Sequence, residues 1–186
     1  MTLRLLMLVG LIGIAIALTD WLQDLREELQ RAPAASRPSA PDYAFHQVLL
    51  TVMGLDGMPR YRIRTPRMAH FPVTESSLLL APTMWFFRNE GPPVEMRARR
   101  ARVFANGERV WLPSEVHIMQ RPHAERPRMK IDTREMTVFP KSKKARTEAR
   151  VVAASGEQRL QGVGMMLDLS AGTLNLESRV RGTYVP

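Results

Sequence analysis

Apolar and polar residues alternate at every second position through most of the chain beyond its first forty residues. The segments 60–65, 94–99 and 128–133 each place apolar or small side chains on one face and mainly charged side chains on the other. A period of two predicts half-buried antiparallel strands. Turn-forming pairs such as Asn106-Gly107 and Ser155-Gly156 separate these segments. We therefore expect an all-β domain, with no helix of consequence in it.

A four-residue block recurs along this domain. The blocks end at Phe71, Phe104, Phe139 and Leu169, which are 33, 35 and 30 residues apart. A turn and a further strand are predicted after each block, at 78–87, 109–118, 145–153 and 173–182. A unit of this size cannot bury its own apolar face, whereas several stacked units can. We expect a twisted, open β-jelly roll of stacked antiparallel strand repeats; chance similarity among β-rich segments is the alternative.

The N-terminal segment has a different pattern. Leu5–Leu18 is a run of 14 residues without a polar side chain, and apolar residues continue at helical spacing beyond Trp21. A membrane span needs about 20 residues, and Leu3–Leu22 supplies that length with an ionisable group near each end. We interpret residues 1–31 as an N-terminal transmembrane helix that runs into an amphipathic stalk.

Two alternatives exist for this segment. The triplet Ala15-Ile16-Ala17 is typical of a signal-peptide cleavage site, although it lies inside the apolar run. A buried core helix is less favoured, because nothing downstream resembles a helical partner. The flanking charges do not decide the orientation. We expect the N-terminus to be cytoplasmic and the rest of the chain to be periplasmic, because the apolar segment acts as an export signal.

A spacer separates this anchor from the folded domain. Residues 32–41 contain three prolines, which are incompatible with a helix and favour an extended linker. The β-domain is then expected to occupy residues 42–186. An open stack of strands has unpaired backbone groups at both ends. The C-terminal strand is the candidate for docking another protein by strand addition, and its predicted docking residues are Val180, Arg181, Gly182 and Tyr184.

Composition narrows the chemistry. The chain has 186 residues, of which 45% are apolar and 24% charged, so it is neither a disordered tail nor a polytopic membrane protein. It has no cysteine, which excludes disulfides, cysteine-based zinc sites and thiol catalysis. The catalytic and phosphate-binding motifs that can be recognised in a sequence are missing, and the four histidines are scattered. We expect a protein that is not an enzyme and that has neither a metal nor a cofactor.

Charge indicates a class of partner. The chain has 27 basic and 18 acidic residues, a net charge of +9. A solvated strand face is the ordinary explanation for any one arginine, yet together these arginines attract polyanions. For an exported domain, a phosphorylated or acidic glycolipid is a more natural partner than nucleic acid, because arginine binds phosphate well. Both a packed core and an open trough for acyl chains fit the apolar faces of the strands.

Short motifs give a family resemblance. The segment 56–63 resembles a D-G-x-x-x-Y-x-[LI] hairpin, and Met68-x-x-Phe71 with the later Leu-x-x-Pro82 resembles its continuation. The segment 176–184 resembles a closing V-R-[GT]-x-Y strand. Together with the anchor, the linker and the β-domain, these motifs resemble the LptC family, the bitopic inner-membrane components of the lipopolysaccharide export machinery.

This resemblance implies a function. The periplasmic domain would be a β-jelly roll of the kind shared with the bridge protein LptA. It would accept lipopolysaccharide from the ATP-driven LptB/LptF/LptG transporter and pass it to LptA docked at the C-terminal edge, with the acyl chains in the apolar interior. The inward-facing, lipid-binding positions would include Val48, Tyr61, Ile63, Leu79, Met96, Ala98, Val116, Ile118, Met129, Ile131 and Val138. The arginine-rich outward faces are more basic than this function requires.

Two other hypotheses fit the same pattern. The domain would be a structural docking module that assembles an envelope complex without binding lipid, or, more distantly, a basic nucleic-acid-binding β-domain in the cytoplasm. Lipid labelling of the inward-facing positions would distinguish a lipid carrier from a docking module. A C-terminal reporter that is active only outside the inner membrane would exclude the cytoplasmic nucleic-acid-binding domain.

Overall fold

The computed structural model describes residues 40–184, apart from residues 89, 105–106 and 125–126. From Pro41 onward the chain forms one compact unit. The predicted anchor at 1–31, and all but the last two residues of the predicted linker at 32–41, lie outside the described residues. Within the part that is described, no helix combines the length and the apolar character needed to cross a membrane.

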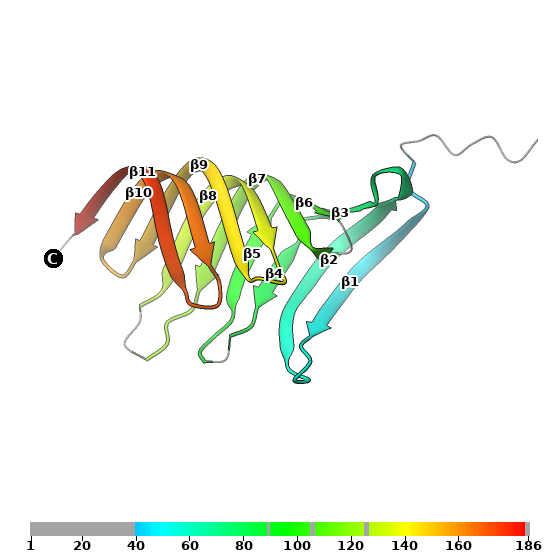
Figure 1. Ribbon diagram of the computed structural model, residues 1–186, viewed down its shortest axis with the longest axis horizontal. Helices are drawn as coiled ribbons and strands as arrows, with labels where there is room; N and C mark the ends of the chain where they lie inside the picture. Colours follow the sequence, from blue (N-terminus) through cyan, green and yellow to red (C-terminus); the bar gives the residue numbers. More distant parts are fainter. Residues whose placement is uncertain (1–39, 89, 105–106, 125–126, 185–186) are drawn as a thin grey trace, which may run out of the picture. The chain divides into compact units, whose positions relative to one another are not determined.

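Eleven strands form one antiparallel sheet (Figure 1). The strands are β1 (Tyr43–Met53), β2 (Pro59–Phe71), β3 (Ser76–Leu80), β4 (Thr83–Phe86), β5 (Val94–Ala98), β6 (Arg100–Phe104), β7 (Arg109–Gln120), β8 (Met129–Phe139), β9 (Lys144–Ser155), β10 (Gln158–Asp168) and β11 (Thr173–Tyr184). Pro72–Thr74 forms a three-residue 3-10 turn between β2 and β3. The prediction of an all-β domain is confirmed.

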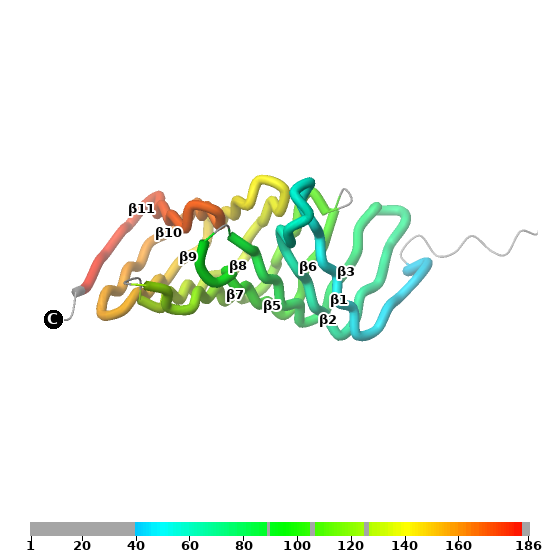
Figure 2. Tube along the Cα trace, turned by 90° about the horizontal axis from the view of Figure 1, so that it is seen from below, coloured from blue at the N-terminus to red at the C-terminus, as the bar shows by residue number. Residues whose placement is uncertain are grey.

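Pairing follows the order of the chain once the short strands are grouped. β2 pairs with β4 through its first half and with β3 through its second half, and β7 pairs in the same way with β5 and β6. Only Ala81-Pro82 separates β3 from β4, and only Arg99 separates β5 from β6. Each of these pairs is therefore one bent strand. The domain is a meander of bent strands, which succeed one another along its length in Figure 2.

The prediction of one continuous strand at 78–87 is wrong in one respect, because the strand is interrupted between β3 and β4. Ala81 has a φ of +44°, and Pro82 has no N–H to donate to a ladder. The two residues turn the chain, and the second part continues in a different direction as β4. The predicted strand at 94–99 ends at Ala98 for a similar reason, since the chain turns at Arg99 before β6.

Most long strands bend near their midpoints as well. Gln47 in β1, Glu135 in β8 and Arg179 in β11 have φ values of +54°, +53° and +50°. The register shifts in β7 between Leu112 and Glu115. The register also shifts next to Glu135 and Arg179, whereas Gln47 bends β1 without a shift. Bulges bend a strand and increase its twist, and Figure 1 shows β7 to β11 arching over the domain. The sheet is thus folded into two layers: one contains β4 and β5, and the other contains β3 and β6.

Buried threonines supply hydrogen bonds at these bends. Thr65 Oγ1 donates to the Leu80 carbonyl oxygen at 2.6 Å, and Thr147 Oγ1 donates to that of Arg134 at 2.7 Å. Thr133 makes a corresponding bond of 3.0 Å. Buried backbone carbonyls need a donor, and a hydroxyl can reach them where the ladder register shifts.

The core lies between the two layers, on the inward faces of the strands. The predicted alternation is confirmed, since Ile63 and Thr65 are 6% and 1% exposed while the adjacent Arg62 and Arg64 are exposed. The largest completely buried side chains include Phe86, Met84, Met96, Leu112, Ile118 and Ile131. Each such side chain contributes about 1.5–3 kcal/mol by leaving water.

The recurring four-residue blocks have equivalent places in the fold. They close β2, β6, β8 and β10, and each precedes a turn into the next strand of the meander. The sequence repeat therefore corresponds to successive strand pairs stacked along the domain.

Candidate functional site

An apolar cavity of about 290 Å³ lies where β1, β2 and β3 meet. β1 contributes one wall, and β2, β3, β6 and β7 contribute the others. The apolar side chains that line it are Tyr43, Val48, Leu50, Val52, Tyr61, Ile63, Met68, Leu79, Val103 and Val110. The volume is close to the lower end of the range of about 300–1,000 Å³ that is typical of ligand pockets.

The cavity exists because β1 is only partly covered. Among the described strands, β1 pairs with β2 alone, and most of its side chains are exposed. Leu50 on the cavity wall is 48% exposed, and Tyr43 is 44% exposed. At the inner end, Ile63, Leu79 and Val110 belong both to the cavity wall and to the core. The cavity is therefore an accessible continuation of the buried interior.

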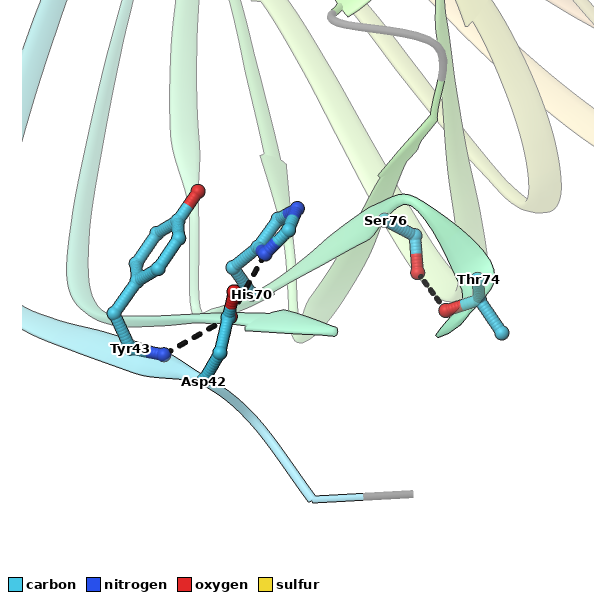
Figure 3. Close-up of polar contacts among 5 residues, drawn as sticks. All are labelled: Asp42, Tyr43, His70, Thr74 and Ser76. Carbon is cyan, nitrogen blue, oxygen red and sulfur yellow. Dashed lines mark hydrogen bonds and ion pairs between the residues drawn. The ribbon is translucent and has the colours of Figure 1, made fainter. Parts of the chain in front are cut away.

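A polar cluster holds the first residues of β1 against the end of β2 (Figure 3). One carboxylate oxygen of Asp42 lies 2.8 Å from His70 Nδ1 and accepts a 3.0 Å hydrogen bond from the Tyr43 N–H. The rings of Tyr43 and His70 stack with centroids 4.6 Å apart. Partial loss of hydration alone raises the pKa of Asp42, but the hydrogen bonds from His70 and the backbone outweigh it and lower the pKa. These contacts position two cavity residues, Tyr43 and His70.

Tyr61 places a phenol in the cavity wall. Burial raises the pKa of this phenol above 10.0, and the nearby charges of Arg60 and Lys141 only partly oppose that effect. The group is therefore neutral at physiological pH. A neutral phenol adds a polar atom to the wall without adding charge, which suits an apolar ligand that carries occasional polar groups.

Four of the eleven sequence-predicted lipid-binding residues line this cavity. They are Val48, Tyr61, Ile63 and Leu79. Six others are buried in the core at 9% exposure or less, and they are Met96, Ala98, Val116, Ile118, Ile131 and Val138. Met129 is partly buried and packs against the core. Contact of any of these eleven residues with lipid stays a prediction.

Sequence reasoning missed several cavity residues, notably Leu50, Val52 and Met68. The signal was obscured in β1, because Gln47 has a positive φ and shifts the alternation by one residue, although the register against β2 is unchanged. Odd-numbered position 43 before Gln47 and even-numbered positions 48, 50 and 52 after it therefore all line the cavity.

The C-terminal strand forms an edge of the sheet. β11 stands at one end of the strand order, and β10 is its only neighbour among the described residues. Val180 is 53% exposed, and Arg181 and Gly182 are exposed as well. Tyr184 pairs with Gln158 through the backbone. The predicted docking residues therefore share one edge strand, and their role in docking stays a prediction.

No group of three or more metal-ligating side chains comes together in the part of the chain that the structure describes. His70 pairs with Asp42, and His117 pairs with Asp132.

Comparison with known proteins identifies the family. The family model described as lipopolysaccharide-assembly, LptC-related, matches residues 8–185. The chain belongs to the LptC family. This confirms the resemblance found in the sequence motifs, and it gives this LptC-family protein a role in lipopolysaccharide transport.

A solved structure has a similar fold. The crystal structure of LptH, the LptA-homologous periplasmic component of the lipopolysaccharide transport device from Pseudomonas aeruginosa, matches with a TM-score of 0.52 and 10% sequence identity. The match covers 68% of this LptC-family chain and 95% of the LptH chain. At this identity the likeness shows the fold alone, an LptA-like jelly roll. No curated protein matches the chain.

Proposed function

We propose that this LptC-family protein takes up the acyl chains of lipopolysaccharide in the cavity bounded by β1, β2 and β3, and passes the lipid toward β11. The observation that carries the proposal is the accessible apolar cavity that continues into the core through Ile63, Leu79 and Val110. Burial of acyl methylenes against such walls contributes about 0.8 kcal/mol each.

The rest of the chain has a corresponding place in this scheme. Residues 1–31 anchor the protein in the inner membrane by a single span, with the N-terminus in the cytoplasm and the β-domain in the periplasm. The LptB/LptF/LptG transporter supplies lipopolysaccharide and performs the ATP hydrolysis. This chain is accordingly a carrier, not an enzyme, and needs no cofactor.

Transfer runs along the interior from the cavity to the far end of the domain. Met96, Ile118 and Ile131 are completely buried on that route, so lipid passes only when the two layers move apart. Methionine is unbranched and adapts to irregular neighbours, which lowers the cost of such repacking at Met96.

The periplasmic bridge protein LptA docks at the opposite end. Its first strand adds to β11 along Val180, Arg181, Gly182 and Tyr184. Main-chain hydrogen bonds supply the affinity in this kind of strand addition. The exposed position of β11 at the end of the sheet supports this part of the proposal.

The second candidate is a docking module that does not bind lipid. One observation favours it: beyond the cavity the interior is filled, with Met96, Val116 and Ile131 at 0% exposure. In that case β11 holds a partner protein and the cavity stays empty.

Site-specific photo-crosslinking in cells separates the two. A photoreactive residue at Ile63 should capture lipopolysaccharide, because Ile63 lines the cavity. The matched control is Arg62, the adjacent residue on the outward face of β2, which should stay unlabelled. A second probe at Met96 reports whether lipid enters the deeper interior. Labelling confined to Arg62 contradicts the carrier function, and a probe at Val180 that captures only protein supports the docking module.

A further inference from the structure

Two further cavities, separate from the apolar one and lined by both charged and apolar residues, share Arg88 and Lys143. Their volumes are about 610 Å³ and 710 Å³. The first also includes Gln120 and His123, and the second includes Arg60. We call these five residues the seam, because they lie at or just beyond the ends of strands in the two different layers.

Polar contacts cross the seam from one layer to the other. Lys143 Nζ, from the turn between β8 and β9, donates to the carbonyl oxygen of Phe87 at 2.9 Å. Arg60, at the start of β2, donates to the carbonyl oxygen of Lys141 at 3.2 Å. Neither cation pairs with a carboxylate in these contacts, and the ammonium group of Lys143 has two further N–H donors.

Arg88 has a hydrogen-bond donor that is buried and unused. Its Nε has no partner among the residues that the structure describes. The two terminal nitrogens lie against the backbone of Gly172, where an added Cβ would be only 3.1 Å from each of them. Gly172 also has a φ of +68°, which strongly favours glycine at this position. The guanidinium therefore lies against main-chain atoms of Gly172 and not against a carboxylate. A buried donor without an acceptor is costly, which indicates an acceptor supplied by a ligand.

The acidic residues of the two cavities do not neutralise the seam. Glu90 is exposed at the border of the first cavity. Asp56 lines the second and is exposed, and its carboxylate accepts a hydrogen bond from the Met58 N–H within its own turn. Arg60, Arg88 and Lys143 therefore leave a net positive site.

We propose that the seam binds a phosphate monoester through Arg88 and Lys143. A guanidinium offers parallel N–H donors to phosphate oxygens, and an ammonium group adds a point charge. Assignment of that phosphate to the headgroup of a glycolipid rests on the function proposed above. A free sugar phosphate carries the same chemistry, so the experiment includes both.

The test measures equilibrium binding to the full chain in detergent micelles. The lipid probe is an acylated, bisphosphorylated glucosamine disaccharide, compared with the same lipid after removal of its phosphates. The free probe is glucosamine 1-phosphate. The variant R88Q/K143Q should bind the phosphorylated lipid and the sugar phosphate about tenfold more weakly or worse, since it loses two charge-assisted contacts. Its affinity for the dephosphorylated lipid should not change.

Two control variants separate the effect of the seam residues from the effect of total charge, and a stability measurement checks folding. R64Q/R100Q removes the same charge from exposed outward positions and should stay within about twofold of the parent protein, because distant exposed charges are screened. R88K/K143R keeps both charges and should retain the preference for phosphate. Thermal unfolding of each variant without ligand shows whether it is folded.

The outcomes distinguish this inference from the proposed function. A preference for phosphorylated lipid that persists in folded R88Q/K143Q overturns the seam site and leaves the carrier function intact. Equal binding of both lipids, with no binding of glucosamine 1-phosphate, also overturns the seam site. If the sugar phosphate binds the parent but not the variant, and Ile63 captures no lipid, the seam site stands and the carrier function fails.

Discussion

At the scale of single residues, the outward faces carry short-range ion pairs between neighbouring strands. His117 on β7 and Asp132 on β8 are register partners, with His117 Nδ1 2.6 Å from Asp132 Oδ1. Lys130 Nζ lies 3.0 Å from the other carboxylate oxygen. Burial alone raises the pKa of Asp132, but the hydrogen bonds from His117 and Lys130 outweigh this effect and hold the pKa below its usual 3.8.

This arrangement predicts an acid-sensitive contribution to stability. A lowered pKa in the folded state makes Asp132 stabilising above about pH 4, and this contribution is lost as the pH falls through the folded-state pKa. An NMR titration of the Asp132 carboxyl carbon should give a midpoint below 3.8. The substitution H117A should raise that midpoint, and H46A on the exposed part of β1 should not. An unchanged midpoint in H117A would contradict the proposed cause.

At the scale of elements, the bends depend on buried hydroxyls. Thr147 in β9 is 3% exposed. Its Oγ1 donates to the carbonyl oxygen of Arg134 and accepts a 3.0 Å hydrogen bond from the N–H of Ala149. One side chain thus pairs two backbone groups at the place where β8 and β9 change register.

The isosteric substitution T147V should therefore destabilise the domain. It keeps the volume but leaves the partly buried Arg134 carbonyl and Ala149 N–H without their partner, and an unpaired buried group costs about 1–3 kcal/mol. Urea unfolding measures this difference. T137V is the control, because Thr137 is a partly exposed outward residue of β8, and its free energy of unfolding should stay within about 0.5 kcal/mol. Equal stability of T147V and T137V would show that the hydroxyl does not support the bend.

Strand elements could be predicted from sequence more completely than the bends. Two-residue alternation identified β5, β8 and the first half of β2, because charged and apolar side chains separate cleanly there. Most of the bends were not predicted, since a bulge shifts the alternation without changing composition. Pro66, Pro82 and Pro113 all lie at or next to such bends, and mid-strand proline was the signal that could have located them.

The cavity was predicted only in part for a related reason. Ile63 on its wall and Ile131 in the core obey the same alternation, and they differ only in how many strands cover them. That number depends on which strand ends the sheet, a property of the whole topology. The seam was not predicted at all, because Arg88 and Lys143 are separated by 55 residues of chain and come together through turns.

At the scale of the whole molecule, the two ends of the sheet have different surfaces. β1 exposes large apolar side chains, including Phe45 at 53% and Leu49 at 57%. β11 exposes backbone along a strand that contains Arg179 and Arg181. The proposed uptake at β1 and the proposed docking at β11 would therefore rely on different interactions, apolar burial in the first case and main-chain hydrogen bonding in the second.

The docking end gives the whole-molecule prediction. V180P removes a backbone N–H from β11 and fixes its φ, so strand addition by LptA should weaken more than about tenfold, the equivalent of one or two hydrogen bonds. Co-purification of LptA from detergent-solubilised membranes measures this loss. V180A, which keeps the N–H, should bind normally. Unchanged recovery of LptA with V180P would place docking elsewhere.

The row of bends has one more consequence. The bends lie along a line between the two layers, and backbone hydrogen bonds join the strands on either side of it. Under the proposed carrier function, rotation of a few backbone torsions at Gln47, Glu135 and Arg179 would be the simplest way for the two layers to move apart. The volume open to a lipid would then depend on the angle between the layers, and the inter-strand hydrogen bonds on either side of the bends would stay intact.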